Sequence, residues 1–213
     1  MVDEEAIMIS YPDGSQYKGT LYQSQRSGFG IMKWKSGAQY QGNWMNGVPE
    51  SFGEYRWPDG RVYIGNYKSN QKHGFGVFTW PDGKKYEGEW KNDKMEGWGE
   101  MKWYSGSIYT GFWKSGKRHG FGRMEHWDGH VYEGTFDSGK LTGHAVEFNT
   151  SIGIKWQGEF INGRKNYLNG YANQINPISS LLRRRAISQN SLMSTEETDT
   201  DQVHGLSGRT PRT

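Results

Sequence analysis

The side chains that could support catalysis are few in this sequence, and their spacing argues against an active site. The chain has 213 residues with six histidines and no cysteine, which excludes disulfides, thiolate metal sites and cysteine nucleophiles. His73 and His119 each precede a Gly-Phe-Gly triplet, and this repeated position indicates a structural role. His126 and His130 could form a metal pair, but no third ligand accompanies them. We therefore expect no catalytic residue, no metal and no cofactor.

Glycine pairs and paired carboxylates also have a structural explanation. Triplets such as Gly74-Phe75-Gly76 lack the third glycine and the following helix of a nucleotide-binding loop. Glu87 and Glu89 lie two residues apart, as solvent-facing residues of one strand do. The net charge is +3 and positive and negative residues are interleaved, whereas nucleic-acid binding requires a basic stripe. We expect no nucleic-acid partner.

The best binding candidates are large aromatic residues that recur every 23 residues. They are Phe29, Phe52, Phe75, Trp98 and Phe121. If each sits on every second strand of a sheet, their side chains project about 10 Å apart from one face and form an apolar stripe. Such a stripe could dock a protein partner. The alternative is that neighbours such as Ile31 and Val77 cover the rings and leave no docking surface.

These aromatic residues are positioned by an internal repeat. A Tyr-x-Gly anchor occurs six times at intervals of 23 residues, starting at Tyr17, Tyr40, Tyr63, Tyr86, Tyr109 and Tyr132, and Trp156-Gln157-Gly158 follows after 24. Glycine, at 31 residues, and 32 aromatic residues replace the aliphatic side chains of an ordinary core. The repeat therefore has to build its core from rings packed over glycine.

Each unit has the pattern of a β-hairpin. In Tyr86-Glu87-Gly88-Glu89-Trp90, apolar and polar residues alternate with the period of a strand. The stretch Trp80-Pro81-Asp82-Gly83 suits a three-residue loop that pairs residue 80 with residue 84, which keeps Trp80 and Tyr86 on one side. The polar stretch 91–96 has room for an even-length turn. We predict an all-β protein, an elongated single-layer antiparallel sheet of tandem 23-residue hairpins.

The ends of the chain depart from this pattern. We expect residues 1–16 to form an N-terminal cap strand, residues 17–170 the repeat array, and residues 171–213 a tail. Within the tail we expect a short basic helix over 177–187, and we expect residues 188–213 to be disordered when free. We count about six full units plus partial ends, because the seventh unit, from Trp156, has no Gly-x-Gly triplet.

The anchors and triplets resemble the MORN repeat, named for membrane occupation and recognition nexus. The resemblance rests on Tyr86-Glu87-Gly88-Glu89-Trp90 and His73-Gly74-Phe75-Gly76 at a 23-residue period, and covers about residues 6–163. It implies an elongated single-sheet array with non-enzymatic roles in scaffolding, membrane apposition and the cytoskeleton. In size and layout the chain is similar to the MORN-only proteins of ciliary radial spoke heads.

The resemblance and the tail together define the functional hypotheses. We expect a scaffold that binds other proteins in a cytoskeletal assembly, a ciliary axoneme such as the radial spoke, with a cytoplasmic location; a homodimer is a further option. The alternative is a module that binds phosphoinositides or anionic membranes, in which Arg183, Arg184 and Arg185 make weak contact with lipid headgroups. Ser188 follows these arginines as in a basophilic kinase target, and is a candidate phosphorylation site.

Overall fold

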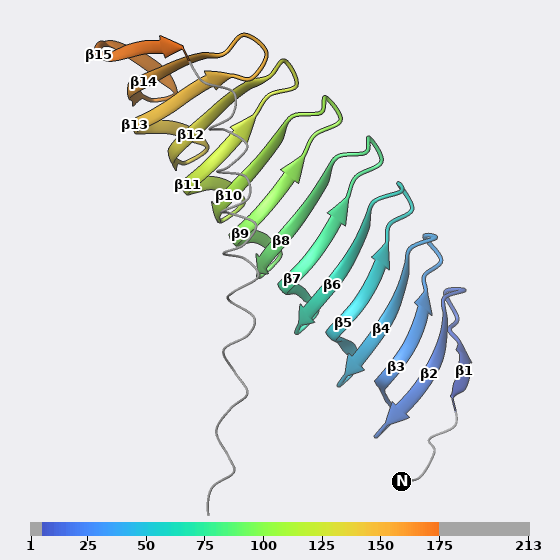
Figure 1. The fold of residues 1–213 in the computed structure, drawn as a ribbon. Coiled ribbons are helices and arrows are strands. Elements are labelled where there is room, and N and C mark those ends of the chain that lie inside the picture. The colour runs from blue at the N-terminus through green and yellow to red at the C-terminus, as the bar shows by residue number, and fades with distance from the viewer. Residues whose placement is uncertain (1–5, 175–213) are drawn as a thin grey trace, which may run out of the picture. The chain divides into compact units, whose positions relative to one another are not determined.

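The fold is a single antiparallel sheet of fifteen strands that follow one another in chain order, as the computed structural model in Figure 1 shows for the residues it describes, 6–174. The strands are β1 (Ile7–Ser10), β2 (Gln16–Tyr22), β3 (Gln25–Lys33), β4 (Gln39–Met45), β5 (Val48–Arg56), β6 (Val62–Lys68), β7 (Gln71–Thr79), β8 (Lys85–Lys91), β9 (Lys94–Lys102), β10 (Ile108–Lys114), β11 (Lys117–Glu125), β12 (His130–Asp137), β13 (Lys140–Asn149), β14 (Ile154–Ile161) and β15 (Arg164–Gln174). The predicted all-β fold of tandem hairpins is confirmed. Over residues 6–174 there is no helix long and apolar enough to cross a membrane.

Two kinds of turn alternate along the sheet, and both match the sequence pattern. In the longer turn, the Trp80 amide donates to the Lys84 carbonyl oxygen at 2.9 Å, which closes the expected three-residue loop. In the shorter turn, Lys91 pairs with Lys94, and the two residues between them both have positive φ, as a type I′ turn requires. This alternation keeps the same face of every hairpin turned toward the core.

The core lies on one face of the sheet, where tyrosine rings cover a row of glycines. Gly65 pairs with Gly76 across β6 and β7, and Gly76 pairs in turn with Gly88 of β8. A Cβ atom at Gly76 would lie 2.6 Å from Cε2 of Tyr63, so a larger residue would displace that ring. Tyr63 is completely buried, and its hydroxyl donates to the carbonyl oxygen of Asn66 at 2.9 Å.

This arrangement recurs in five successive units. The anchor tyrosines are fully buried and donate to the carbonyl oxygen three residues later, at 2.9 to 3.0 Å, in Tyr17, Tyr40, Tyr63, Tyr86 and Tyr109. Edge-to-face ring contacts link neighbouring units: Tyr63 lies 5.2 Å from Tyr67 and 5.4 Å from Trp90 between ring centroids. Aromatic packing therefore forms a continuous core in a sheet that has no second layer over residues 6–174.

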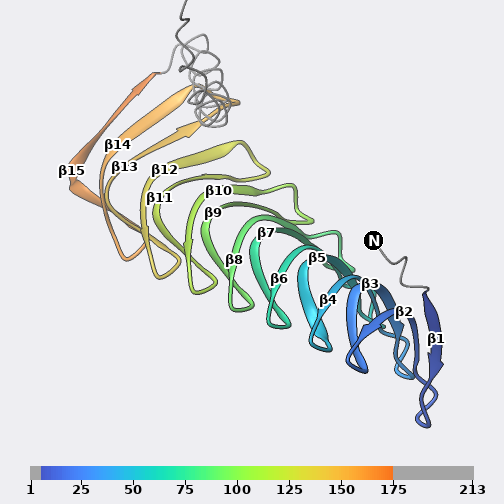
Figure 2. The same cartoon turned by 90° about the horizontal axis from the view of Figure 1, so that it is seen from below.

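A bulge in every second strand bends the sheet. Between β6 and β7 the register runs from Gly65 opposite Gly76 to Tyr67 opposite Lys72, so three residues of β7 face one residue of β6. Gly74 lies inside this bulge with a φ of +62°, which suits glycine. Viewed from below, the strands bend in the same direction and give the sheet a concave face (Figure 2). The aromatic core lines that concave face.

The last unit differs from the regular units in two ways. In β15 four residues, 167–170, face Gly158 of β14 in a widened bulge, and a Cβ atom at Gly170 would lie 2.5 Å from Cε2 of Trp156. The seventh unit therefore has its glycine floor, one residue later than the 23-residue spacing indicates, because its bulge is longer. Strand β15 continues to Gln174, so the sheet extends past residue 170, where we expected the array to end. The predicted helix over 177–187 lies outside the described residues.

Candidate functional site

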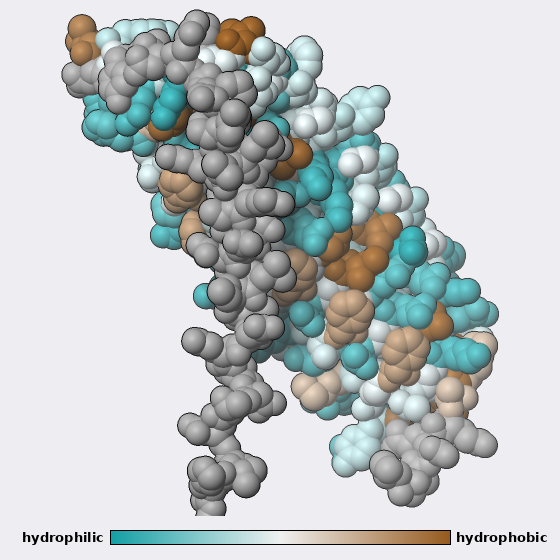
Figure 3. Space-filling model, viewed as in Figure 1, coloured by the Kyte–Doolittle hydropathy of each residue, from teal (hydrophilic) through white to brown (hydrophobic). Residues whose placement is uncertain are grey.

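The recurrent aromatic residues lie on the convex face, opposite the tyrosine core, and are exposed to solvent. The exposed fractions of the five side chains are 57 % for Phe29, 54 % for Phe52, 54 % for Phe75, 41 % for Trp98 and 58 % for Phe121. Ile31 and Val77 share this face and leave the rings about half exposed. We call these five residues the aromatic ladder. Apolar rings spaced along the sheet, with hydrophilic side chains between them, are visible in Figure 3.

The bulge fixes each ring of the aromatic ladder on this face. In β7, Phe75 directly follows Gly74, the residue with positive φ, and Asn66 Nδ2 donates to the Phe75 carbonyl oxygen at 3.3 Å. In β9 the equivalent contact is reversed, because Glu89 Oε1 accepts a hydrogen bond of 2.8 Å from the Trp98 amide. A polar side chain on the preceding strand thus satisfies the bulged backbone, and the ring itself stays available for contact.

A second candidate site is a pocket on the concave face, near the C-terminal end of the described sheet. Its volume is about 710 Å³, and it lies over β11 to β15. Its lining residues are Arg118, Met124, His126, Tyr132, Phe136, Gly139, Lys140, Leu141, Phe160, Gly163, Arg164, Lys165 and Tyr167. The pocket combines an apolar floor with four cationic side chains, and its lining contains no carboxylate.

The pocket exists because smaller residues replace the rings that fill this face elsewhere. Trp90 and Trp113 are buried in their units, and their indole nitrogens donate to Gly76 and Gly99 carbonyl oxygens at 3.1 and 3.2 Å. The corresponding residues in the last two units are phenylalanines, which are shorter and lack this donor. They are Phe136 and Phe160.

Ala145 interrupts the glycine row at the same place. It lies opposite Gly134, where other units have a second glycine, so the Tyr132 ring cannot settle onto the sheet. The Tyr132 hydroxyl instead donates to Glu147 Oε1 at 3.2 Å. Burial, together with the nearby Glu147 carboxylate, raises the pKa of Tyr132 to about 12.

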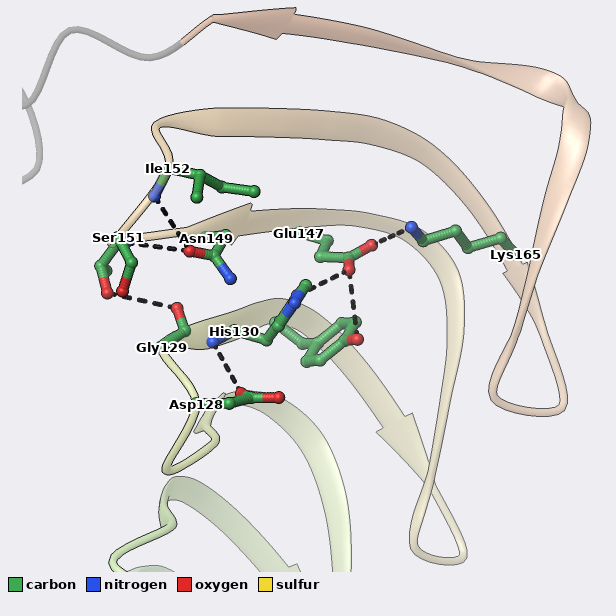
Figure 4. A network of polar contacts seen from close by, with 10 residues as sticks. Asp128, Gly129, His130, Glu147, Asn149, Ser151, Ile152 and Lys165 are labelled. Atoms are coloured by element: carbon green, nitrogen blue, oxygen red, sulfur yellow. Dashed lines mark hydrogen bonds and ion pairs between the residues drawn. The ribbon is translucent and has the colours of Figure 1, made fainter.

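Glu147 is the centre of a polar cluster that organises one wall of the pocket. Its carboxylate is buried at 7 % exposure, accepts from Tyr132, lies 3.2 Å from His130 Nδ1, and pairs with Lys165 Nζ. Figure 4 shows Glu147 and Lys165 meeting on the concave side of the bent strands. Glu147 neutralises the Lys165 ammonium, and this ion pair links β13 to β15 across β14.

The other cationic side chains of the pocket differ in the contacts that they make with the rest of the protein. Arg118 Nη2 donates to the Gly139 carbonyl oxygen at 2.7 Å, and its guanidinium lies 5.2 Å from the Phe136 ring centroid. Lys140 and Arg164 are exposed, and neither has a carboxylate partner within residues 6–174. These two side chains carry the uncompensated positive charge of the pocket.

The residues considered for chemistry in the sequence are dispersed. Within residues 6–174 no three His, Asp or Glu side chains are placed to hold a metal ion. The His126 ring packs edge-to-face on Tyr132 at 5.6 Å, while His130 faces Glu147, so the two do not act as a pair. His119 Nδ1 lies 3.4 Å from Asp137 Oδ1. Arg183, Arg184, Arg185 and Ser188 lie outside the described residues.

Sequence reasoning found the aromatic ladder but missed the pocket. Four signals for the pocket are present in the sequence: phenylalanine in place of tryptophan at 136 and 160, alanine at 145, and histidine in place of tryptophan at 126. Each of them looks like loss of a consensus residue. Only the packing shows that His126, Phe136 and Phe160 line one pocket, while Ala145, opposite Gly134, acts on it through the Tyr132 ring.

Comparisons with known proteins address the repeat. The MORN repeat matches residues 17–39, 40–60, 63–85, 86–108, 109–130 and 132–149, which together make up more than half of the chain. No curated protein matches the sequence.

Solved structures give only distant likenesses. One is the TCP domain of SAS-4 of Drosophila melanogaster in complex with a proline-rich motif of Ana2, at 12 % identity and a TM-score of 0.43, covering 69 % of this chain and 79 % of that one. Another is a mutant of the TCP10 domain of Danio rerio CPAP, at 14 % identity and a TM-score of 0.33, covering 74 % and 85 %. At these values the likenesses carry no argument about function.

Proposed function

Because the chain belongs to the MORN repeat family, we propose that it is a non-enzymatic scaffold that binds other proteins through the aromatic ladder. MORN repeats are modules that interact with proteins or membranes. The location that we propose is cytoplasmic, in a cytoskeletal assembly of the ciliary axoneme such as the radial spoke.

The observation that carries this proposal is the exposure of the aromatic ladder. Five large rings remain 41 to 58 % exposed at a constant spacing, although each one costs solvation free energy in water. A row of this kind gives a partner several equivalent apolar contacts along one face of the sheet. Contacts that repeat on one rigid surface strengthen one another, because ordering the first contact aligns the rest.

Proximity labelling in the native cell tests the proposal. The variant carries Phe52→Thr, Phe75→Thr and Trp98→Thr, which remove three neighbouring rings but keep residues that favour strands. The control is Ile64→Thr, a residue of the same face that is 39 % exposed and lies off the ladder. We expect the wild type and the control to label the same axonemal proteins, and the triple variant to lose them.

Two results would contradict the proposal. If the triple variant labels the same proteins as the wild type, the ladder is not the docking surface. If the wild type labels membrane proteins alone and floats with phosphoinositide liposomes, the membrane-binding alternative is correct. That alternative depends on Arg183, Arg184 and Arg185, and no contact of the described residues supports it.

A homodimer also stays a prediction, which light scattering of the full chain tests.

A further inference from the structure

We propose that the pocket of the concave face binds an acidic peptide segment that carries a large apolar side chain. This site lies on the opposite face from the aromatic ladder, so its occupant is a second partner, or a second segment of the same partner. The inference rests on the charge of the pocket, on its apolar floor and on its place in the bend of the sheet.

The charge of the pocket selects an anionic ligand. Arg118, Lys140, Arg164 and Lys165 line it, and its lining includes no aspartate or glutamate. Glu147 neutralises Lys165, whereas Lys140 and Arg164 find no carboxylate among residues 6–174. Two exposed cations at one rim attract carboxylates from a partner and steer its approach.

The excess of positive charge belongs to this end of the sheet. Residues equivalent to Lys140 and Arg164 in the first three units are neutral: Gln25, Val48 and Gln71. The next two units have Lys94 and Lys117 there, but in those units the neighbouring core position is filled by the buried tryptophans Trp90 and Trp113. Only in the last two units do the rim cations adjoin an open floor.

The floor of the pocket selects an apolar group. Phe136, Leu141 and Phe160 are buried beneath it, Met124 adds an adaptable thioether, and Tyr167 stands at the margin with 75 % of its side chain exposed. A volume of about 710 Å³ is in the range of pockets that enclose a ligand of several functional groups. A bare phosphate or carboxylate would leave this apolar surface uncovered.

The shape of the sheet favours a peptide over a membrane. The cluster around Glu147 points into the concave side of the bent strands (Figure 4), and its members Tyr132 and Lys165 also line the pocket. A bilayer surface is flat and cannot reach a recessed floor without large deformation, whereas a peptide can lie along the trough. An extended acidic segment can then insert one apolar side chain between Tyr132 and Tyr167 and place its carboxylates at the rim.

Fluorescence anisotropy with the full chain tests this proposal. The probe is a labelled peptide in which one phenylalanine is flanked by glutamates, and the comparison probes replace either phenylalanine by serine or the glutamates by lysines. We expect the first probe to bind at low salt, the two comparison probes to bind at least tenfold more weakly, and affinity to fall as salt rises.

Matched protein variants identify the site. The double variant Lys140→Glu and Arg164→Glu reverses two exposed rim charges, and Tyr167→Ala removes an exposed ring; none of the three residues is buried. We expect the double variant to weaken binding at least tenfold and Tyr167→Ala several-fold. The control is Lys94→Glu with Lys117→Glu, which makes the same change of net charge at the equivalent positions of earlier units, and which should leave affinity within about twofold of the wild type.

Three results would overturn the proposal. The first is that the acidic probe fails to bind the wild type at millimolar concentration in low salt. The second is that the rim variant and its control bind the probe equally, which would show only a general effect of charge. The third is that the rim variant loses binding to vesicles of phosphatidylcholine and phosphatidylserine but keeps binding to the peptide, which would make the pocket a lipid site.

Discussion

The regular units in β2 to β11 and the last units in β12 to β15 share the same hairpin but differ in their packing. The regular units form a closed core, whereas the last units form a pocket. In the regular units a tyrosine lies over two glycines and donates to its own strand, as Tyr63 does to Asn66. In the sixth unit Ala145 fills the place of the second glycine, and Tyr132 turns to Glu147. The added methyl group of Ala145 thus turns Tyr132 away from the sheet and into the wall of the pocket.

The comparison shows where a repeat protein can acquire a site without loss of its fold. Regular units hold the sheet together through neighbour contacts, so one unit can lose packing while the adjacent units remain intact. The open floor loses packing free energy. New polar contacts offset part of this loss, because the Glu147 carboxylate contacts Lys165, His130 and Tyr132. On the convex face the aromatic ladder keeps its spacing from Phe29 to Phe121 and then ends, because the next position of the repeat is His144.

The largest effect that we expect is loss of the regular units at alkaline pH. Burial raises the pKa of Tyr109 to about 12 and raises the pKa values of Tyr40, Tyr63 and Tyr86 as well. The neutral phenol is the form that the folded state favours, so its stabilisation is complete below the unfolded pKa of about 10 and is lost as pH rises toward 12. Each fully buried tyrosine then contributes a loss on the order of 2 kcal/mol, and the four together exceed the margin of many domains.

Urea unfolding at a series of pH values between about 8 and 11.5 measures this loss. Tyr109→Phe should reduce the dependence of unfolding free energy on pH above 10, because the variant lacks one phenol whose pKa is raised in the folded state. Tyr104→Phe is the control, since that side chain is 86 % exposed, and it should leave the dependence unchanged. Equal curves for the two variants would show that burial of the anchor tyrosines does not stabilise the sheet.

The next effect comes from placing the alanine of the sixth unit into a regular one. Gly76→Ala forces the Tyr63 ring off the sheet and breaks its bond to Asn66, and we expect the unfolding free energy to fall by about 3 kcal/mol. The reverse change, Ala145→Gly, should be neutral or stabilising, because Tyr132 can then settle over the floor. Chemical denaturation measures both. The two regions do not differ in packing if the unfolding free energy lost in Gly76→Ala is smaller than the unfolding free energy gained in Ala145→Gly.

A smaller effect is expected from exchanging the rings that fill the concave face. Trp90→Phe loses the indole bond to the Gly76 carbonyl oxygen and leaves a small cavity, for a cost of about 2 kcal/mol. Phe136→Trp in the last units should donate to Gly122, stabilise the fold by up to about 1 kcal/mol, and narrow the pocket so that the acidic probe binds more weakly. A Phe136→Trp protein that binds the probe as tightly as the wild type would show that Phe136 does not bound the pocket.

The smallest effect concerns the bulge of β5, where a serine stands in place of the glycine. Ser51 takes a φ of +60° where other units have glycines such as Gly74, and this conformation is unfavourable for a residue with a side chain. Ser51→Gly should raise the unfolding free energy by about 0.5–1 kcal/mol, after the added entropy of the unfolded glycine chain is counted. The matched reverse change, Gly74→Ser, should lower it by a similar amount. Thermal unfolding of both variants checks the sign.

Much of the fold could be predicted because its rules are local. The 23-residue spacing and the period of two place Tyr86 and Trp90 on one face, and the parity of each turn keeps that face constant. The ladder position of Phe75 follows from the same alternation. The glycine floor of the seventh unit could not be predicted, because Gly170 reaches its place only through a bulge that is longer than in other units.

The sequence by itself determined the repeat, the two faces and the turns, since each depends on residues close together along the chain. Only the tertiary structure decided which of the residues that depart from the regular repeat lie together. Phe136, Ala145 and Phe160 come from β12, β13 and β14. Glu147 of β13 forms an ion pair with Lys165 of β15. Their meeting depends on pairing register and on bend, which are properties of the whole sheet. The physical reason is that a pocket is defined by the volume that packing leaves empty, and no spacing along one strand records that volume.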